Sequence, residues 1–273
     1  MKDLEFWKMN GSGNDFILID NRDGKVKEEE MRPLVERVCR RRESVGADGL
    51  IFVTRSERHD FAWRFFNADG SEAEMCGNGG RCVARFASLK GIAGPRMTFE
   101  TLAGPVSAEV MGRIVKVLMP DPRDLRRDID LPLEAGWVSV DFINTGVPHT
   151  VVRVQSLSDH PVVAQGRVVR HHPRFSPAGT NADFISLSGS DVIELRTYER
   201  GVEDETLACG TGAIASALVA AARGIVKSPV TVKTRGGDLL KIHFEKVGES
   251  FRQVWLEGPT AIACEGRLHE EAM

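Results

Sequence analysis

Met75–Gly91 reads MCGNGGRCVARFASLKG, and Ala208–Gly224 reads ACGTGAIASALVAAARG. Each segment places a cysteine, Cys76 or Cys209, directly before a Gly-x-Gly turn, which leads into residues with helical spacing that end at a glycine. A helix N-terminus exposes unpaired backbone N–H groups and carries a partial positive charge, so it favours an anion such as a thiolate or a bound carboxylate. The two segments therefore predict two helices, each with a cysteine at its N-terminal end.

The likeness between the two segments continues along the chain. A shift of 133 positions superimposes the two cysteines and several residues on either side of them. The matched pairs include Phe65 with Tyr198, Gly91 with Gly224, and Thr101 with Thr234. Because this shift is close to half of the 273 residues, we interpret the chain as two related halves that arose by internal duplication.

The composition is that of a globular protein, with 42% hydrophobic and 27% charged residues. The net charge of −3 gives no reason to expect a nucleic-acid or membrane partner, and no apolar run is long enough to cross a bilayer. The five cysteines are odd in number and irregularly spaced, which argues against a disulfide framework. Without an N-terminal apolar segment, a cytoplasmic location is expected.

The pattern along the chain predicts an α+β fold with many strands and few helices. Further helices are expected at Glu28–Glu43 and Val162–His171, and a linker at the Asp-, Arg- and Pro-rich stretch Pro120–Pro132. Ala213–Ala222 is apolar nearly all round, so its helix should be packed in the centre of its half. Strands are predicted at Leu4–Met9, Phe16–Asp20, Leu50–Thr54, Phe61–Phe66, Thr98–Thr101, Val106–Val110, Ile114–Met119, Trp137–Ile143, Thr150–Val154, Val192–Tyr198, Val230–Thr234, Leu239–Phe244 and Val254–Glu257. The expected domains are residues 1–122, joined by 261–273, and residues 123–260.

Two thiols at helix N-termini have a reason to ionise near neutral pH, and a pair of them facing one ligand can act as base and acid. With an α-amino acid as ligand, the thiolate removes the α-proton from one face and the thiol returns a proton to the other, which inverts the centre. Helix N-terminal amides that hold the α-carboxylate would stabilise the charge that develops. The pair would titrate together.

The other cysteines and the histidines have simpler interpretations. Cys39, Cys82 and Cys264 are expected to be buried structural residues. No CxxC motif or paired histidine spacing accompanies Cys76 and Cys209, so no metal site is predicted. His171 and His172 fall near a helix end and are expected at the surface or in a cap, whereas His149 either lines the site or belongs to a turn.

Several motifs together resemble the diaminopimelate epimerase family, from residue 4 to about residue 260. They are Gly11-Ser-Gly-Asn14-Asp15-Phe16, Phe66-Asn67-Ala-Asp-Gly-Ser71, Cys76-Gly-Asn-Gly79, Tyr198-Glu199-Arg200-Gly201, Glu205-Thr206 and Ala208-Cys209-Gly-Thr-Gly212. The resemblance implies two pseudo-symmetric domains, each a sheet wrapped around a central helix, with the active site in the cleft between them. It also implies interconversion of LL- and meso-diaminopimelate without pyridoxal phosphate or another cofactor, and relatives of this kind suggest a homodimer.

The resemblance also implies a role for individual residues. Cys76 and Cys209 would be the acid/base pair. Glu199 would take the substrate ammonium group and Arg200 a carboxylate, for which its planar fork is suited. The remaining substrate-binding residues would be Gly77, Asn78, Gly210 and Thr211 at the helix starts, and Asn14, Asn67 and Asn181 towards the distal centre.

Two positions depart from the family's usual pattern. Val147 stands where the family often has asparagine, and Asn10 stands where histidine is frequent. Neither touches the acid/base pair, but both bear on substrate selectivity. The alternatives left open are a proline or hydroxyproline racemase of the same fold, a thiol redox switch that joins Cys76 to Cys209, and a ligand-binding module without catalysis.

Overall fold

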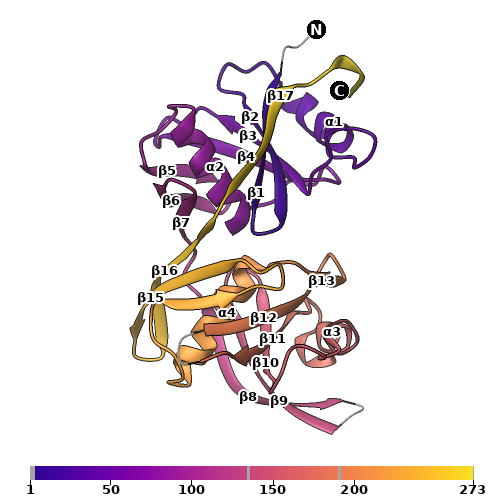
Figure 1. The fold of residues 1–273 in the computed structure, drawn as a ribbon, viewed down its shortest axis with the longest axis vertical. Coiled ribbons are helices and arrows are strands. Elements are labelled where there is room, and N and C mark those ends of the chain that lie inside the picture. The colour runs from indigo at the N-terminus through magenta and orange to yellow at the C-terminus, as the bar shows by residue number, and fades with distance from the viewer. Residues whose placement is uncertain (1–3, 134–135, 190–191, 273) are drawn as a thin grey trace. The chain divides into compact units, whose positions relative to one another are not determined.

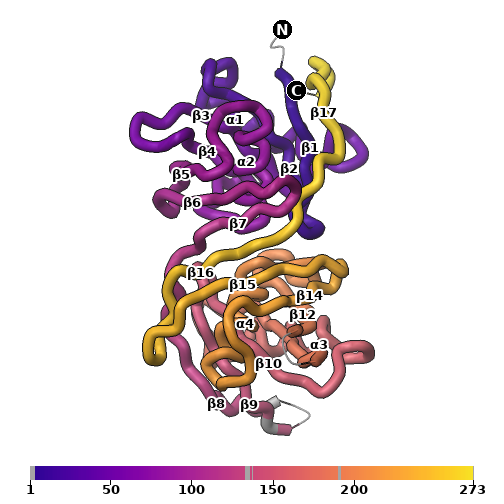
Figure 2. The backbone as a smooth tube through the Cα atoms, turned by 60° about the vertical axis from the view of Figure 1, so that its left-hand side comes forward, coloured from indigo at the N-terminus to yellow at the C-terminus, as the bar shows by residue number. Residues whose placement is uncertain are grey.

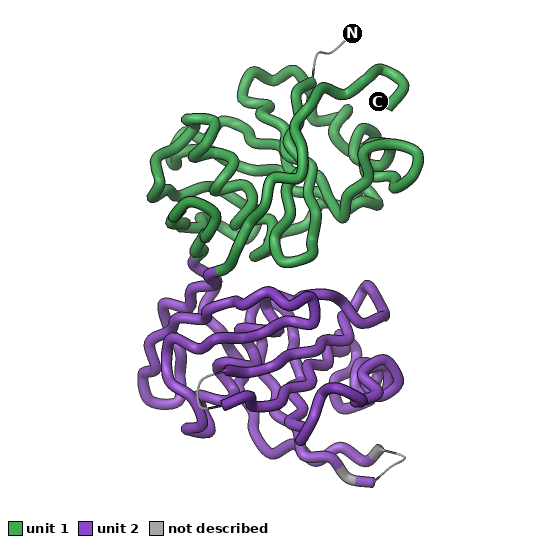
Figure 3. Tube along the Cα trace, viewed as in Figure 1, with its two compact units in different colours: residues 1–117, 258–273 green, residues 118–257 purple. Residues whose placement is uncertain are grey.

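The computed structural model describes residues 4–133, 136–189 and 192–272, which form two compact units (Figure 3). Unit 1 comprises residues 1–117 and 258–273, and unit 2 comprises residues 118–257. The C-terminal segment thus returns to the unit that contains the N-terminus.

Unit 1 is built on a mixed sheet whose strands run in the order β17-β1-β2-β3-β4-β5-β6-β7 (Figure 1). The pairs β2–β3 and β4–β5 are parallel, and the other neighbours are antiparallel. The strands are β1 (Glu5–Gly11), β2 (Asn14–Asp20), β3 (Gly49–Thr54), β4 (Phe61–Asn67), β5 (Arg96–Thr101), β6 (Gly104–Met111), β7 (Ile114–Leu118) and β17 (Ala261–Arg267).

Unit 2 repeats this arrangement in the order β8-β9-β10-β11-β12-β14-β15-β16, with β10–β11 and β12–β14 parallel. A short additional strand, β13, pairs with β12. The same succession of parallel and antiparallel neighbours in both units agrees with the predicted duplication. The strands are β8 (Arg123–Leu133), β9 (Gly136–Asn144), β10 (Pro148–Arg153), β11 (Asn181–Leu187), β12 (Val192–Glu199), β13 (Asp204–Thr206), β14 (Val230–Lys233), β15 (Leu239–Val247) and β16 (Ser250–Pro259).

Each sheet curls around one helix, α2 (Gly77–Leu89) in unit 1 and α4 (Gly210–Ala222) in unit 2 (Figure 2). Helix α4 packs against strands from β9 to β15 and is buried at every position but Thr211. Its small apolar side chains allow strands to approach from all sides. The prediction of a central, all-apolar helix is confirmed.

Both central helices end in the same way. Gly91 after α2 and Gly224 after α4 adopt the left-handed conformation, with φ of 66° and 73°. The next residue donates its N–H to the carbonyl five residues earlier, Ile92 to Ala87 at 2.8 Å and Ile225 to Ala220 at 2.9 Å. This is the Schellman arrangement, in which glycine carries no Cβ penalty. The glycine ends predicted from the sequence are therefore confirmed.

The two remaining α-helices pack in equivalent places. Helix α1 (Glu28–Val38) follows β2 and packs on β4, while α3 (Val162–Arg170) follows β10 and packs on β11 and β12. Gly166 is needed in α3 because a Cβ there would lie 2.3 Å from the Cβ of Tyr198. Short 3-10 helices occur at Pro173–Phe175 and Glu270–Ala272.

Two predictions about the elements were wrong, and three strands were missed. Helix α1 ends at Val38 rather than Glu43, because the chain turns back and the Gly46 N–H bonds to the Val38 carbonyl at 2.9 Å. The expected linker is largely strand β8, whose polar residues are accommodated by register shifts and by positive φ at Asp124 and Asp128. Strands β11, β13 and β17 were not predicted.

The constant shift of 133 also misaligns one strand. Phe65 pairs with Ile51 across β3 and β4, and Thr197 pairs with Asp183 across β11 and β12. Tyr198 instead packs with α3, as Phe66 packs with α1. The structural partner of Phe65 is therefore Thr197 and not Tyr198.

Candidate active site

Cys76 is the N-cap residue of α2. Its backbone is extended (φ −144°, ψ 118°), and its Sγ accepts a hydrogen bond of 3.5 Å from the Gly79 N–H. The thiol thus takes the position usually held by serine, threonine or aspartate. Its side chain is half-buried, so Cys76 caps the helix and remains partly exposed.

Cys209 is the N-cap of α4 in the same geometry, with φ −120°, ψ 111° and a 3.4 Å bond from the Gly212 N–H. The Thr211 hydroxyl lies 3.4 Å from Sγ. Cys209 is more deeply buried than Cys76. Burial raises the pKa of the Cys209 thiol well above its ordinary value, and the carboxylates of Glu199 and Asp183 add to this, against the hydrogen bonds from Thr211 and Gly212. At this thiol burial thus opposes the effect of the helix terminus on which the expectation of an ionised thiol rested.

Two of the predicted binding residues of unit 1 meet at the start of α2. The Asn78 amide donates a 2.6 Å hydrogen bond from Nδ2 to Oδ1 of Asn14, at the start of β2. Gly77 precedes Asn78 in the same helical turn. Asn67 ends β4 with an exposed side chain whose Nδ2 donates to the Ser71 hydroxyl at 3.0 Å; within the described residues, no hydrogen bond links it to this group.

The two charged residues that orient these amides were not predicted from the sequence. Asp48 accepts a 3.0 Å bond from Nδ2 of Asn14, and Arg81 donates from Nη2 to Oδ1 of Asn78 at 2.9 Å. The Arg81 guanidinium is fully buried and also donates to Ser12 Oγ at 3.0 Å. Arginine in a helix next to a glycine-rich turn gives no sequence signal of burial.

In unit 2, Asn181 and the chain around Arg200 are joined directly. Oδ1 of Asn181 accepts from the Arg200 backbone N–H at 2.8 Å, and its Nδ2 donates to the Pro148 carbonyl at 3.1 Å. The Arg200 side chain donates to the Ala178 carbonyl at 3.0 Å. Glu199, at the end of β12, lies close enough to influence Cys209 electrostatically.

A buried polar cluster beneath α4 was also not predicted from the sequence. Of its members only His149 had been considered, either as a residue that lines the site or as part of a turn. His149 Nδ1 lies 2.6 Å from Asp183 Oδ2, and the Thr197 hydroxyl donates to Asp183 Oδ1 at 2.7 Å. A carboxylate can only accept, so Nδ1 of His149 carries the proton. His149 thus lies in the interior of unit 2 rather than in an exposed turn.

The other cysteines and histidines differ in their surroundings. Cys39 and Cys82 are buried, and burial raises the pKa of each thiol to about 12, which agrees with structural roles. Cys264 is exposed on β17, so the expectation that it is buried was wrong. His171 follows the last residue of α3, and His172 caps the short helix after it, as predicted.

Of the two positions that depart from the family pattern, Asn10 lies in β1 next to its turn and Val147 lies in the connection between β9 and β10. The Asn10 side chain accepts a 3.1 Å bond from the Gly13 N–H. The Val147 carbonyl accepts a bond of the same length from the Thr145 N–H. In the same connection the Asn144 side-chain oxygen accepts a 3.0 Å bond from the Gly146 N–H.

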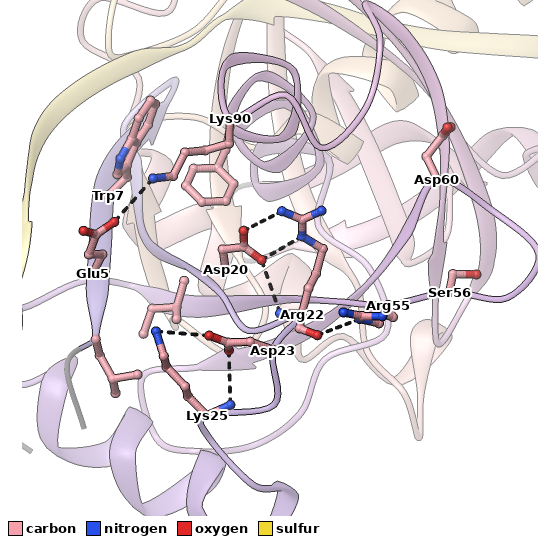
Figure 4. Close-up of a pocket in the computed structure, with 13 residues that line it drawn as sticks. Glu5, Trp7, Asp20, Arg22, Asp23, Lys25, Arg55, Ser56, Asp60 and Lys90 are labelled. Carbon is pink, nitrogen blue, oxygen red and sulfur yellow. Dashed lines mark hydrogen bonds and ion pairs between the residues drawn. The ribbon is translucent and has the colours of Figure 1, made fainter. Parts of the chain in front are cut away.

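A cavity of about 660 Å³ in unit 1 lies away from this chemistry (Figure 4). It is lined by Phe86 and Lys90 at the far end of α2, about 20 Å along the helix from Cys76. Its charged side chains bind one another, as in the pairs Asp20–Arg22 and Glu5–Lys90. This cavity is not the candidate site.

In the part of the chain with described coordinates, no three His, Cys, Asp or Glu side chains are grouped so that they could hold a metal ion. Among the same residues, no helix is long and apolar enough to cross a membrane.

Comparison with known proteins gives full-length matches. A family model for diaminopimelate epimerase matches residues 6–123 and 142–260. Diaminopimelate epimerase of Aquifex aeolicus (strain VF5) is 48% identical over 281 residues, which cover 99% of both chains. The Hydrogenobaculum sp. (strain Y04AAS1) enzyme of the same name is 44% identical and covers 97% of this chain and 98% of its own.

Solved structures share the fold at low identity. A PhzF-family phenazine biosynthesis protein of Bacillus anthracis has a TM-score of 0.77 at 16% identity, covering 98% of this chain and 100% of its own. A hydroxyproline epimerase of Agrobacterium vitis has a TM-score of 0.73, also at 16% identity, covering 99% and 93%. These likenesses concern the fold alone, whereas the sequence matches extend over the cysteine helices and nearly the whole chain. The chain belongs to the diaminopimelate epimerase family.

Proposed function

We propose that the protein interconverts LL- and meso-diaminopimelate by a two-base mechanism that uses Cys76 and Cys209 and no cofactor. The observation that carries this proposal is the pair of thiols, each the N-cap of the central helix of its unit. Family membership supports the substrate, which belongs to the route to lysine and peptidoglycan precursors.

The central difficulty of the reaction is the weak acidity of the α-carbon proton. A thiolate takes this proton to form an S–H bond, and the other thiol gives its proton to the opposite face of the carbon. The electron pair left on the substrate spreads into its carboxylate. The helix-start N–H groups at Gly77, Asn78, Gly210 and Thr211 would stabilise that charge, because donors fixed before the reaction need no reorganisation.

The remaining polar side chains would set substrate orientation. Glu199 would bind the ammonium group beside the reacting carbon, and its electrostatic effect on Cys209 supports this place. Arg200 would bind a carboxylate. Asn14, Asn67 and Asn181 would hold the distal centre; Val147, which offers no side-chain hydrogen bond, makes the contribution of these amides larger.

We also propose that the protein is a homodimer in the cytoplasm. Strand β17 supports the dimer: among the residues that the structure describes its partner strand is β1, and Ile262, Ala263 and Cys264 are exposed on it. An exposed edge strand of this kind offers unpaired backbone groups to a second chain. All five cysteines are free thiols, which suits a reducing compartment. Light scattering of the purified protein tests the dimer.

The test of the reaction is incubation of the reduced protein with meso-diaminopimelate in D2O, without added cofactor. Deuterium at one α-carbon and the appearance of the LL isomer are expected. The Cys76→Ser and Cys209→Ser proteins are the matched controls, since serine can retain the cap. No exchange with diaminopimelate, together with exchange of proline or hydroxyproline, would reject the substrate assignment. Exchange that persists in both serine variants would reject the two-base mechanism.

A further inference from the structure

The first turn of α4 packs on a buried carboxyl group. Asp183 is fully buried, with His149 and Thr197 donating hydrogen bonds to its carboxylate at 2.6 and 2.7 Å. A Cβ placed on Gly212 would lie 2.5 Å from Oδ1 of Asp183. The carboxylate is therefore packed directly against the helical turn that Cys209 caps.

The equivalent place beneath α2 is apolar. A Cβ placed on Gly79, the counterpart of Gly212, would lie 3.3 Å from Cδ1 of Ile51 and 3.5 Å from Cε1 of Phe16. The strand registers identify the counterparts: Ile51 pairs with Leu18 and Phe65, as Asp183 pairs with Val151 and Thr197. The duplicated fold has thus kept the positions and changed their charge.

The first turns of α2 carry the opposite charge. Arg81 is fully buried in the helix and donates to the Gly77 carbonyl at 3.4 Å and to Asn78 Oδ1 at 2.9 Å. The same position of α4 holds Ile214, also buried. A guanidinium remains protonated at all relevant pH values. The cation therefore favours an anion at the α2 N-terminus at any pH of interest.

Further charged or titratable groups lie near the two turns. In unit 2, Arg200 follows Glu199 and donates to the Ala178 carbonyl, and His149, which faces Asp183, carries a charge only when both of its ring nitrogens are protonated. In unit 2, Glu199 at the end of β12 adds a second negative charge towards Cys209. In unit 1, the Asp48 carboxylate reached through Asn14 is neutralised by Arg41 at 2.8 Å. Buried charges act on a neighbouring titratable group with little screening by water.

We propose that these opposite buried charges fix the resting protonation state of the pair, with Cys76 as the thiolate and Cys209 as the thiol. The assignment of acid and base roles rests on the proposed function. In the first half-reaction Cys76 Sγ takes the α-proton, and the S–H proton of Cys209 passes to the opposite face of the carbon. Turnover therefore leaves the two protonation states exchanged, and one proton must return from Cys76 to Cys209 before the same isomer can react again. Asp183 and Arg81 are positioning residues in this scheme.

The test follows each thiol separately in the full-length reduced protein without substrate. Cysteine labelled with ¹³C at Cβ gives one resonance per residue, assigned with Cys→Ser variants, and its chemical shift reports ionisation without a reagent that must reach the buried sulfur. On raising the pH, Cys76 is expected in the thiolate form while Cys209 is still a thiol. Asp183→Asn, in which Thr197 and a switched His149 tautomer can satisfy the amide, is expected to lower the Cys209 midpoint by about one pH unit or more, a tenfold change in ionisation.

Two controls test whether the effect of Asp183→Asn is confined to Cys209. Cys76 should titrate at an unchanged pH in Asp183→Asn, and Asp159→Asn, which removes an exposed carboxylate from the same unit, should move neither resonance. Ionisation of Cys209 before Cys76 would overturn the proposal from the parent protein alone, even if no variant folds. An unmoved Cys209 in Asp183→Asn, or an equal shift of both thiols, would also overturn it. Since no substrate is used, the expected titration in a protein inert in the D2O experiment would reject only the substrate assignment.

Discussion

The Asn14 side-chain oxygen accepts a 2.6 Å hydrogen bond from the Asn78 amide, and this contact lies in the middle of a directed chain. At one end the Asp48 carboxylate accepts from Asn14, and at the other the Arg81 guanidinium donates to Asn78. A carboxylate cannot donate and a guanidinium cannot accept, so the two ends fix the orientation of both amides. Each amide oxygen is therefore occupied, and these contacts use one of the two N–H bonds of each amide nitrogen.

Breaking this chain should weaken substrate binding more than turnover. In Asp48→Ala the Asn14 amide is no longer oriented, and we expect KM to rise about tenfold, equivalent to about 1.4 kcal/mol, with a smaller change in kcat. Steady-state kinetics in both directions measure this. Asp23→Asn, which removes an exposed carboxylate bound to Lys25, is the matched control. An unchanged KM in a folded Asp48→Ala protein would show that the amide orientation does not matter.

The capping role of the cysteines predicts that serine and alanine variants differ in stability. Serine can accept the hydrogen bond from Gly79 or Gly212, whereas alanine cannot, so the alanine variants should lose about 1 kcal/mol of unfolding free energy relative to serine. Both should lose activity by at least about 10²-fold, because a hydroxyl relays a proton poorly. Urea unfolding and the epimerase assay on the same four proteins separate the effects. Alanine variants as stable as the serine variants would exclude a capping contribution.

The sequence predicted those parts of the molecule that local signals control. The cysteine-glycine turns, the glycine ends of α2 and α4 and the all-apolar α4 all follow from short-range backbone requirements, and all are present. Strand β8 was mistaken for a linker because its bulges at Asp124 and Asp128 place polar residues where alternation is expected.

The burial of Asp183 and Arg81 could not be predicted from the sequence, for a different reason. Aspartate and arginine are usually exposed, so Asp183 and Arg81 gave no hint of burial. Their role depends on partners from distant parts of the chain, such as Ser12 for Arg81 and His149 for Asp183. In addition, the constant shift of 133 positions is wrong by one residue at Thr197 and its partner strand, so it does not align Asp183 with its structural counterpart Ile51. The difference in charge between the two halves becomes visible only when the strands are packed beneath α2 and α4.

The paired glycines Gly79 and Gly212 offer a direct comparison of the two halves. In Gly212→Ala the new methyl would meet the Asp183 carboxylate at 2.5 Å, a distance that Cβ atoms do not tolerate, so the first turn of α4 must move. In Gly79→Ala the nearest atom is the flexible end of Ile51 at 3.3 Å. We expect Gly212→Ala to lower kcat/KM by at least about tenfold more than Gly79→Ala, since small displacements of catalytic groups are costly. Equal losses would show that the contact with Asp183 does not hold the turn in place.

Acid stability should depend on the contacts of Asp15. Burial by itself would raise the pKa of Asp15, but hydrogen bonds and charges from Arg41 and Lys8 lower it below its ordinary value of 3.8. Because the folded pKa is below the unfolded one, this carboxylate contributes its full stabilisation above about pH 4 and loses it as the pH falls through the folded pKa.

In Arg41→Met the two hydrogen bonds to Asp15, of 3.1 and 2.5 Å, are lost while the burial remains. The unfolding free energy of this variant should therefore begin to fall at a higher pH during acidification. Urea midpoints measured from about pH 7 down to about pH 3 check this, with Arg40→Met, which removes only an exposed pair with Glu43, as the control. Identical acid profiles for Arg41→Met and Arg40→Met would mean that the Asp15–Arg41 pair adds nothing to acid stability.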